Sequence, residues 1–428
     1  MENHYRLNIF LFFVLFSSFL FAESKYIKPE DLSEEKLVSQ IVMLYAPLLD
    51  RGKISRFIQE NTPAAIFLNK SNLPKKGRAD ARTTKELLDK IRNFYRIQGL
   101  LPPLFAIDQE MGYVTRITKN VTHFPSAYAV GTAFRKLKEE NSQKAKQMVW
   151  GMAFHVCRDL LRFGVDWNLT PVADVNSNPN NPVIGVRSFG DNPRLVAEVA
   201  LLYSQGLRDA GCLDSIKHFP GHGDTKKDSH KALPYVKASW ETLNNRELFP
   251  FKHIIEDNPA SVMLAHIVFP EQDKWPASFS FFWQTKILKE KFGFQGIIIS
   301  DDLMMQGARA LFPNPSDMAT RAIAAGTDML LIAMGAKDLY PPIKKTLIRK
   351  IKQDAKWKKQ ILESARKINQ IKLKYFTRQK EPYFRYSLLP ADKINQELSR
   401  KAITKLIGNY YMPKSKYIYC DNPTKAIH

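Results

Sequence analysis

Three histidines and two aspartates lie within the fourteen residues from Lys217 to His230, which form the densest group of chemically competent side chains in the sequence. The segment starts in an apolar run and continues as a loop interrupted by glycine and proline. Asp228 precedes His230 by two residues, so its carboxylate can orient the imidazole and support its cationic form. Because histidine titrates near neutral pH, this pair predicts general acid/base catalysis from a mobile loop.

A zinc site is the alternative interpretation of the same segment. His218 and His222 have a spacing that occurs in zinc proteins, and Asp224, Asp228 or His230 could complete the ligand set. That spacing works best on a helix, and the proline and glycines between the two histidines disfavour a helix. We therefore favour acid/base catalysis, with no metal, and expect His222 to hold the loop through hydrogen bonds.

A second candidate group follows the apolar run Ile297–Ile299, where Ser300 is succeeded by Asp301 and Asp302. A carboxylate at the end of a buried strand is held rigidly, which suits a nucleophile. The next carboxylate points in another direction, so we expect Asp302 to fix a neighbouring loop or helix start. An aspartate after an apolar run is common, and this pattern alone does not assign a role to Asp301.

Short apolar runs alternate with helical patterns along the chain. One helix is expected from Pro193 to about Ala210, because proline suits a first turn and Gly211 suits a stop. Eight strand–helix units predict a closed (β/α)8 barrel, with a doubly wound open sheet as the alternative. The predicted strands are Ile41–Ala46, Ala64–Leu68, Pro103–Ile107, Val165–Leu169, Ser215–Phe219, Ser261–Ala265, Gly296–Ser300 and Met329–Ala333.

Polar side chains follow or close these strands. In a barrel the carboxyl ends of all strands meet at one face, where catalytic groups lie. The sequence therefore predicts one site that contains Asp108, Asp174, Lys217, His218, His266, Asp301 and Asp302.

The composition and the N-terminal sequence indicate which binding partners and which cellular compartment to expect. The net charge of +22 favours association with anionic polymers or membrane surfaces, although a solvated basic surface without a partner is the alternative. No aromatic-interleaved basic motif of a nucleic-acid-binding protein is present. Residues 1–22 resemble a signal peptide, with an uncleaved anchor as the alternative. The cysteines are Cys157, Cys212 and Cys420, and two of the three lie in segments that look buried, so no disulfide framework is implied despite export.

From about Leu32 to Lys374 the chain resembles the bacterial β-N-acetylhexosaminidase branch of glycoside hydrolase family 3. The resemblance depends on six motifs in a fixed order, which makes a chance match untenable. They are Asp108–Glu110, Pro171–Asn176, Asn181–Gly190, Lys217–His230, Ala265–His266 and Ser300–Leu303.

The resemblance implies a TIM-like barrel over residues 23–380 and a retaining mechanism without cofactor or metal. Asp301 would attack the anomeric carbon to form a glycosyl-enzyme. His230, oriented by Asp228, would be the general acid/base, in place of the second carboxylate of most retaining enzymes. The positions that would hold the hydroxyls of the terminal sugar are Asp108, Arg187, Lys217 and His218.

Two features depart from the family pattern. After the strand that precedes Asp108 the family commonly reads Asp-(Gln/His)-Glu-Gly-Gly-Arg-Val, whereas this chain has Met111 and Tyr113 at the first glycine and the arginine. The rim of the pocket is therefore expected to differ. Residues 381–428 resemble the linker helix, near Asn395–Ile407, and the first strand, Lys416–Cys420, of a second domain that some members carry. We expect this extension to pack on the barrel.

The resemblance predicts an exported, monomeric, exo-acting β-N-acetylglucosaminidase that removes terminal N-acetylglucosamine from peptidoglycan-derived or chitin-type fragments. The basic charge suits association with anionic envelope polymers. Two alternatives remain: a phosphorylase of the same branch, since an imidazole repels phosphate less than a carboxylate does, and a non-catalytic glycan-binding envelope protein.

Overall fold

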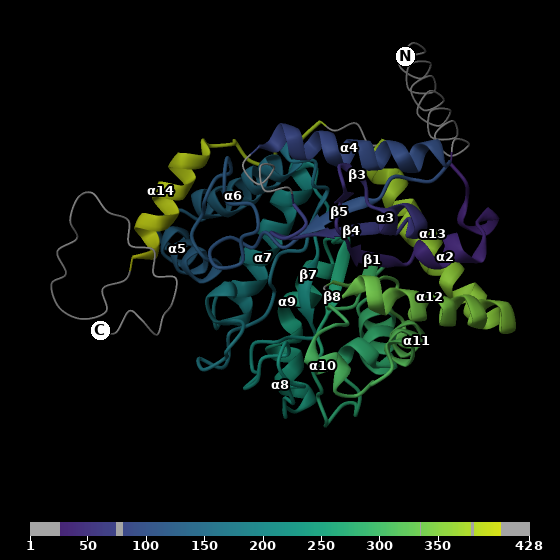
Figure 1. Ribbon diagram of the computed structural model, residues 1–428. Helices are drawn as coiled ribbons and strands as arrows, with labels where there is room; N and C mark the ends of the chain where they lie inside the picture. The colour runs from purple at the N-terminus through teal and green to yellow at the C-terminus, as the bar shows by residue number, and fades with distance from the viewer. Residues whose placement is uncertain (1–25, 74–79, 334, 378–380, 404–428) are drawn as a thin grey trace, which may run out of the picture.

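The computed structural model describes residues 26–73, 80–333, 335–377 and 381–403 (Figure 1). Eight short parallel strands lie at the centre, and each coincides with a run predicted from its apolar composition. Their side chains are almost all buried, as expected for strands covered on both faces. The strands are β1 Val42–Tyr45, β4 Ala65–Leu68, β5 Leu104–Ile107, β6 Trp167–Asn168, β7 Ile216–Phe219, β8 Ser261–Leu264, β9 Ile297–Ile299 and β10 Leu330–Ile332.

The strands follow one another around a ring. Parallel ladders form a five-stranded sheet in the order β10-β1-β4-β5-β6 and a three-stranded sheet in the order β7-β8-β9. The ladder is interrupted at two joints, which isolated parallel bridges span: Trp167 with Leu213 and Val172 with Lys217 at the first, and Ile299 with Met329 at the second. The architecture is thus the predicted TIM-like α/β barrel rather than an open doubly wound sheet. A small antiparallel hairpin, β2 Leu49–Asp50 with β3 Lys53–Ile54, follows β1.

Helices surround the strands (Figure 1). The α-helices are α2 Glu34–Ser39, α3 Arg56–Asn61, α4 Ala81–Ile97, α5 Ala127–Glu140, α6 Ser142–Arg162, α7 Pro193–Ala210, α8 Trp240–Asn245, α9 Leu248–Ile255, α10 Gln306–Arg309, α11 Pro315–Ala325, α12 Ala336–Gln353, α13 Ala355–Thr377 and α14 Ala391–Ala402. Shorter or irregular helices are η1 Pro29–Asp31, η2 Gly185–Arg187, η3 Ala277–Phe279 and η4 Phe282–Lys291, the last a π-helix. Among the described residues, the helices are too short or too polar to cross a membrane.

Helix α7 has the boundaries that the sequence predicts. The Asn192 side chain accepts hydrogen bonds from the first backbone N–H groups, and Pro193 occupies the first turn. Gly211 ends the helix with φ 107°, a conformation that glycine adopts without steric cost. A Cβ atom at Gly206 would lie 2.3 Å from the carbonyl oxygen of Trp150, so the glycine allows α7 to pack closely on α6.

This close packing corrects the expectation for the cysteines. Cys157 on α6 and Cys212, just after α7, form a disulfide although 55 positions separate them in the chain. Both cysteines are buried, and the expectation of no disulfide is wrong for this pair. The two helices lie side by side in the barrel wall and bring the Cα atoms to 5.8 Å, which is a normal disulfide separation.

The C-terminal extension packs on the barrel through α14, which begins four residues earlier than predicted. Ile394 and Leu398 are fully buried against α5 and α6. Lys144 on α6 forms an ion pair with Glu397 at 2.7 Å. The predicted signal peptide and the predicted strand Lys416–Cys420 lie outside the described residues.

Candidate active site

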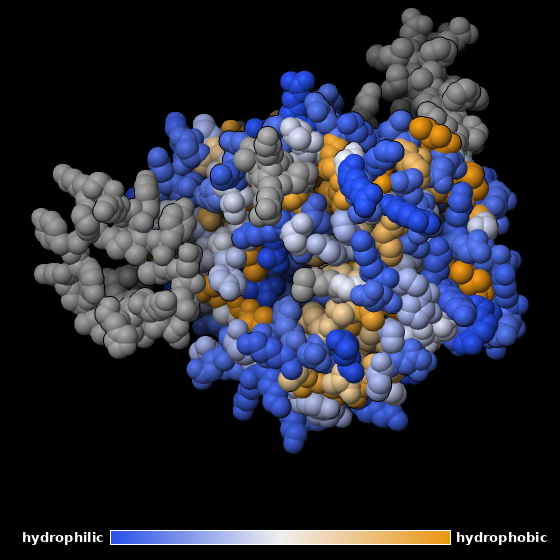
Figure 2. Space-filling model, viewed as in Figure 1, coloured by the Kyte–Doolittle hydropathy of each residue, from blue (hydrophilic) through white to orange (hydrophobic). Residues whose placement is uncertain are grey.

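The predicted site residues meet at the carboxyl end of the barrel. Asp108 directly follows β5, Lys217 and His218 lie on β7, and Asp301 lies two residues beyond β9. Arg187 is brought to them by η2, in the long loop between β6 and α7. Figure 2 shows a hollow with hydrophilic residues at its depth near the centre of this face, where Figure 1 labels α7 and β7.

A buried ion network connects three of the predicted sugar-binding residues through Glu110. The Lys217 ammonium lies 2.7 Å from an Asp108 oxygen and 2.6 Å from a Glu110 oxygen. Arg187 donates to both Glu110 oxygens, from Nε at 2.8 Å and from Nη2 at 2.9 Å. This two-point contact fixes the guanidinium plane, as is common for arginine–carboxylate pairs.

The network keeps Lys217 and Glu110 charged in spite of their burial. Burial opposes the charge on Lys217, but Asp108 and Glu110 outweigh it and raise the pKa of the ammonium. Burial likewise opposes ionisation of Glu110, yet Arg187 and Lys217 hold the pKa of that carboxyl far below its usual value. The pocket thus presents fixed cations and carboxylates, which suit hydrogen bonding to sugar hydroxyls.

Asp174, shortly after β6, organises the next part of the site. One of its carboxylate oxygens lies 2.7 Å from His218 Nδ1, and the other accepts the backbone N–H of His222 at 2.7 Å. His222 in turn lies 2.9 Å from the hydroxyls of Thr225 and Ser229, one at each ring nitrogen. The prediction that His222 holds the loop is confirmed. Burial lowers the pKa of His222 to about 4, so its ring is neutral near pH 7.

The Asp228–His230 pair has the geometry of an oriented imidazole. An Asp228 oxygen lies 2.8 Å from His230 Nδ1 and also accepts the His230 backbone N–H at 2.9 Å. The pKa of Asp228 is lowered, because its hydrogen bonds to His230 outweigh its partial burial. The His230 side chain is 61% exposed, which leaves its Nε2 edge accessible to a bound molecule.

Asp301 is surrounded by imidazoles. Burial would raise the pKa of its carboxyl, but His266, His218 and His230 outweigh burial and lower the pKa. Asp301 is therefore ionised near pH 7. His266 is fixed by Ser278, 2.6 Å from Nδ1, and by the Asp302 carbonyl oxygen, 3.0 Å from Nε2.

The neighbouring Asp302 has a different role, as predicted from the sequence. Its Oδ1 accepts the backbone N–H groups of Met304 and Ala333, at 3.0 and 2.9 Å, and so fixes the loop after β9 to the end of β10. Burial raises the pKa of Asp302 to about 6. The two adjacent carboxyls thus have pKa values on opposite sides of the ordinary aspartate value.

Sequence reasoning placed Asp174 in the site without a specific role, and it assigned no role to Glu110 or Arg116. Glu110 bridges Lys217 and Arg187, and Asp174 joins His218 to His222. Arg116 lies 3.8 Å from Asp108, and its buried Nε has no hydrogen-bond partner among the described residues. Glu110 and Arg116 could have been predicted from their position in the sequence, because both closely follow the strand that ends before Asp108. Residues that follow the strands of a barrel lie at its catalytic face.

Met111 and Tyr113, which depart from the family motif, occupy a tight turn beside Glu110. Met111 has a positive φ of 74° and Gly112 one of 58°, and the Glu110 N–H donates to the Val114 carbonyl across the turn. Met111 is buried, whereas the Tyr113 side chain is exposed. The Glu110 contacts to Lys217 and Arg187 are present beside this turn.

The geometry does not favour the zinc interpretation. The ring nitrogens of His222 are both engaged with hydroxyl groups, and His218 Nδ1 faces Asp174. Over the described part of the chain, no cluster of three or more histidine, cysteine, aspartate or glutamate side chains has an arrangement that could hold a metal ion.

A ring of parallel strands that gathers carboxylates, imidazoles and buried cations at its carboxyl end defines a TIM-like barrel with an enzyme-type site. The model of the glycosyl hydrolase family 3 N terminal domain matches residues 34–371, and the chain belongs to this family. The family resemblance drawn from the sequence motifs is confirmed.

Individual relatives are consistent with this membership. The chain is 36% identical over 252 residues to β-hexosaminidase A of Pseudoalteromonas piscicida. This alignment covers 56% of this chain and 41% of that protein. It is 35% identical over 234 residues to a β-hexosaminidase of Methylobacillus flagellatus, covering 54% of this chain and 64% of the relative. Each alignment thus spans less than two thirds of the relative.

A solved structure of a glycoside hydrolase family 3 β-N-acetylglucosaminidase from a Paenibacillus species superimposes with a TM-score of 0.76. The two chains are 28% identical, and the superposition covers 90% of this chain and 72% of the other.

Proposed function

We propose that this protein is an exo-acting, retaining β-N-acetylglucosaminidase. The observation that carries the proposal is the ionised Asp301 at the end of β9, held near His230, whose imidazole is oriented by Asp228. A carboxylate nucleophile and a separate proton donor are the two groups that retaining glycoside hydrolysis requires.

In the first step an oxygen of Asp301 attacks the anomeric carbon, and the bond from that carbon to the leaving oxygen breaks. The His230 imidazolium donates its Nε2 proton to the leaving oxygen, while Asp228 stabilises the cation through Nδ1. In the second step neutral His230 takes a proton from water, and the resulting hydroxide displaces Asp301 from the same carbon. Two inversions leave the configuration of the anomeric carbon unchanged.

The terminal sugar is held by the buried ion network. Lys217 and Arg187 donate charge-assisted hydrogen bonds to sugar oxygens, and Asp108 accepts them from hydroxyl hydrogens. Because these groups are already fixed by Glu110, they do not have to be ordered when the sugar binds. His218, held by Asp174, is the fourth member of this set.

The names of the relatives support this assignment. The Paenibacillus structure is described as a β-N-acetylglucosaminidase, and the two curated relatives are called β-hexosaminidases. We infer that the substrate carries a terminal N-acetylglucosamine and comes from peptidoglycan or chitin-type material.

We also propose that the protein works outside the cytoplasm. The apolar segment within residues 1–22 supports export, and so does the Cys157–Cys212 disulfide, since such bonds persist in oxidising compartments. Alkylation of free thiols in cell fractions before reduction tests this. A protein found with both thiols free, in the cytoplasmic fraction, would contradict it.

The activity is tested with a chromogenic β-N-acetylglucosaminide and the matching β-glucoside. We expect the wild type to cleave the first much faster, and Asp301→Ala to abolish cleavage. Equal rates on both sugars would refute the substrate, and an active Asp301→Ala would refute the mechanism. Product analysis with and without phosphate separates hydrolysis from phosphorolysis.

A further inference from the structure

The segment from Lys345 to Lys359, in which α12 meets α13, is strongly basic. It contains seven lysine or arginine residues and a single carboxylate, Asp354. Six of the seven cations are exposed, and the seventh, Lys350, is partly buried. We call the six exposed residues the basic corner: Lys345, Arg349, Lys352, Lys356, Lys358 and Lys359.

The basic corner has a fixed shape. On α12 its cations are spaced i, i+4 and i+7, so they share one face of the helix. The buried side chains of Ile343 and Leu347 lie on the opposite face, against the barrel. Lys350 Nζ lies 4.6 Å from the centroid of the Trp357 ring, and this contact connects the last turn of α12 to the first turn of α13. The cations are therefore presented by packed helices.

No neighbouring carboxylate neutralises the basic corner. None of its six side chains forms an ion pair or a hydrogen bond with another described residue. Partly buried cations of the same two helices do have partners, since Lys344 donates to Asn61 at 3.1 Å and Lys367 pairs with Asp328 at 2.9 Å. The charge that remains uncompensated is thus the charge that faces outward.

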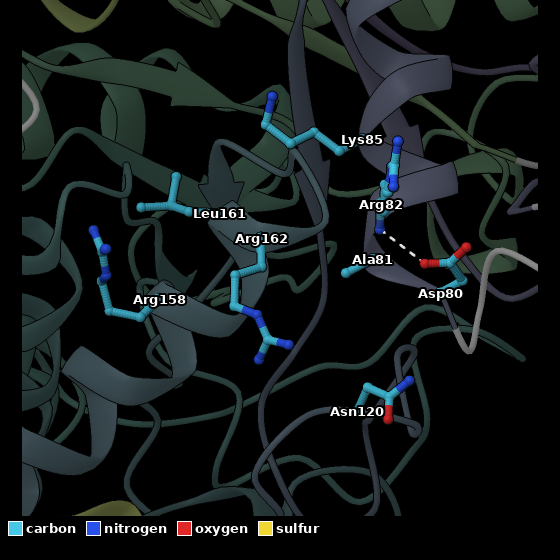
Figure 3. Close-up of a pocket in the computed structure, with 8 residues that line it drawn as sticks. All are labelled: Asp80, Ala81, Arg82, Lys85, Asn120, Arg158, Leu161 and Arg162. Atoms are coloured by element: carbon cyan, nitrogen blue, oxygen red, sulfur yellow. Dashed lines mark hydrogen bonds between the residues drawn. The ribbon is translucent and has the colours of Figure 1, made fainter.

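Another group of cations lines the groove between α4 and α6, where Arg82, Lys85, Arg158 and Arg162 lie (Figure 3). Carboxylates on the same helices neutralise three of these four. The ion pairs are Arg82–Glu86, Lys85–Asp89 and Arg162–Asp159. This groove has little free charge to offer a partner, so it serves as a reference for the basic corner.

The basic corner lies at the edge of the face that carries the active site. Figure 1 shows α12 extending to the right-hand edge of the molecule, whereas the hollow in Figure 2 lies near the centre, where Figure 1 labels β7. Residues 352–356, at the joint between α12 and α13, are all exposed, so the joint projects from the surface. A large partner can therefore contact the basic corner while the site stays open to substrate.

We propose that the basic corner docks this protein on a membrane surface that contains anionic phospholipids. Clusters of about four to eight lysine and arginine residues on an amphipathic helix bind such surfaces through the lipid headgroups. A projecting corner meets a flat sheet of headgroup charges, whereas a single polymer strand is held in a groove that follows its backbone. The proposal concerns the position of the protein in the cell and does not depend on its catalytic activity.

The test compares two variants that lose the same charge. The corner variant is Lys345→Gln/Arg349→Gln/Lys352→Gln, and the matched control is Arg82→Gln/Lys85→Gln/Arg162→Gln, which removes cations that carboxylates already neutralise. Glutamine keeps a good helix former at every position. Binding is measured at low salt by cosedimentation with vesicles of phosphatidylglycerol and phosphatidylcholine, and with vesicles of phosphatidylcholine alone. Matching thermal unfolding midpoints show that both variants are folded.

We expect the wild type to bind the phosphatidylglycerol vesicles more tightly than the neutral ones, with a preference that added salt weakens. The corner variant should lose about fivefold in affinity per cation, and so on the order of 100-fold in all, whereas the control should lose far less. Equal losses in the two variants would overturn the proposal, because net charge alone would then explain binding. Wild-type protein that binds both kinds of vesicle alike would also overturn it.

Inorganic polyphosphate, added as a soluble competitor, tests the other source of negative charge. We expect it to displace the protein from the vesicles only at a large excess of phosphate over lipid headgroups. Displacement at equal phosphate concentration, with polyphosphate binding that the corner substitutions abolish, would assign the basic corner to an anionic polymer and overturn the assignment to a membrane.

Discussion

The His222 ring lies 2.9 Å from the Ser229 hydroxyl, and this contact joins the start of the 220–230 loop to the residue between Asp228 and His230. The loop is also anchored on α10, where the Gly307 N–H donates to the Ser229 carbonyl at 3.0 Å. Ser229 is therefore held from two sides. The position of the exposed His230 imidazole therefore depends on the buried residues His222 and Ser229.

This arrangement predicts that His222 and Ser229 act as one positioning unit. Replacing either by alanine should lower kcat about 10–100-fold through misplacement of His230, with little change in KM. The double variant should be no worse than the worse single variant, because both remove the same contact. A double-mutant cycle in kcat measures this, and additive losses would contradict it.

The pH profile separates positioning from proton transfer by His222. Because its pKa is lowered to about 4, its ring stays neutral between pH 5 and 8. The Ser229→Ala variant should therefore keep the shape of the wild-type profile in that range. A profile displaced by a full pH unit would show that the ring takes part in the titration that controls turnover.

Asp228→Asn should impair leaving-group protonation more than nucleophilic attack. For a substrate with a poor leaving group we expect kcat for glycosylation to fall about 100-fold, because the amide stabilises the imidazolium less than a carboxylate does. For a dinitrophenyl glycoside, whose leaving group needs no proton, the loss should be slight. Single-turnover rates on both substrates test this, and equal losses would argue against His230 as the acid.

The raised pKa of Asp302 predicts a pH-dependent stability. Since the folded-state pKa is about 6 and the ordinary value is 3.8, the folded protein binds this proton more tightly than the unfolded chain. The resulting stabilisation is complete below pH 3.8 and is lost as the pH rises through 6.

Asp302→Asn keeps an Oδ1 acceptor for Met304 and Ala333 and removes the buried charge. The variant should exceed the wild type in free energy of unfolding by on the order of 2 kcal/mol at pH 8, with a smaller difference at pH 5. Urea unfolding at both pH values provides the measurement. A difference that does not depend on pH would show that the carboxyl is not buried as described.

The C-terminal extension should contribute to stability rather than to turnover. Ile394 and Leu398 are fully buried, so Leu398→Ala should lower the free energy of unfolding by about 2–4 kcal/mol. The kcat of the folded variant should match the wild type, because α14 packs on α5 and α6 and not on the site. Deletion of residues 390–428 should likewise leave kcat largely unchanged in any variant that is soluble and folded.

The local sequence was enough to predict the features of this protein that depend only on residues close together in the chain. The strands could be placed because each is a short apolar run covered on both faces. The ends of α7 followed from Pro193 and Gly211, and the Asp228–His230 contact follows from a separation of two residues in one turn of the loop.

Tertiary structure decided the contacts that span long stretches of chain. Lys217 meets Asp108 across 109 positions, and Arg187 meets Glu110 across 77. Family motifs named most of these residues, but composition and spacing do not show which carboxylate pairs with which cation. The Cys157–Cys212 disulfide was missed for the same reason. Such pairings are set when the strands close into a ring, because closure brings the ends of distant strands to one face.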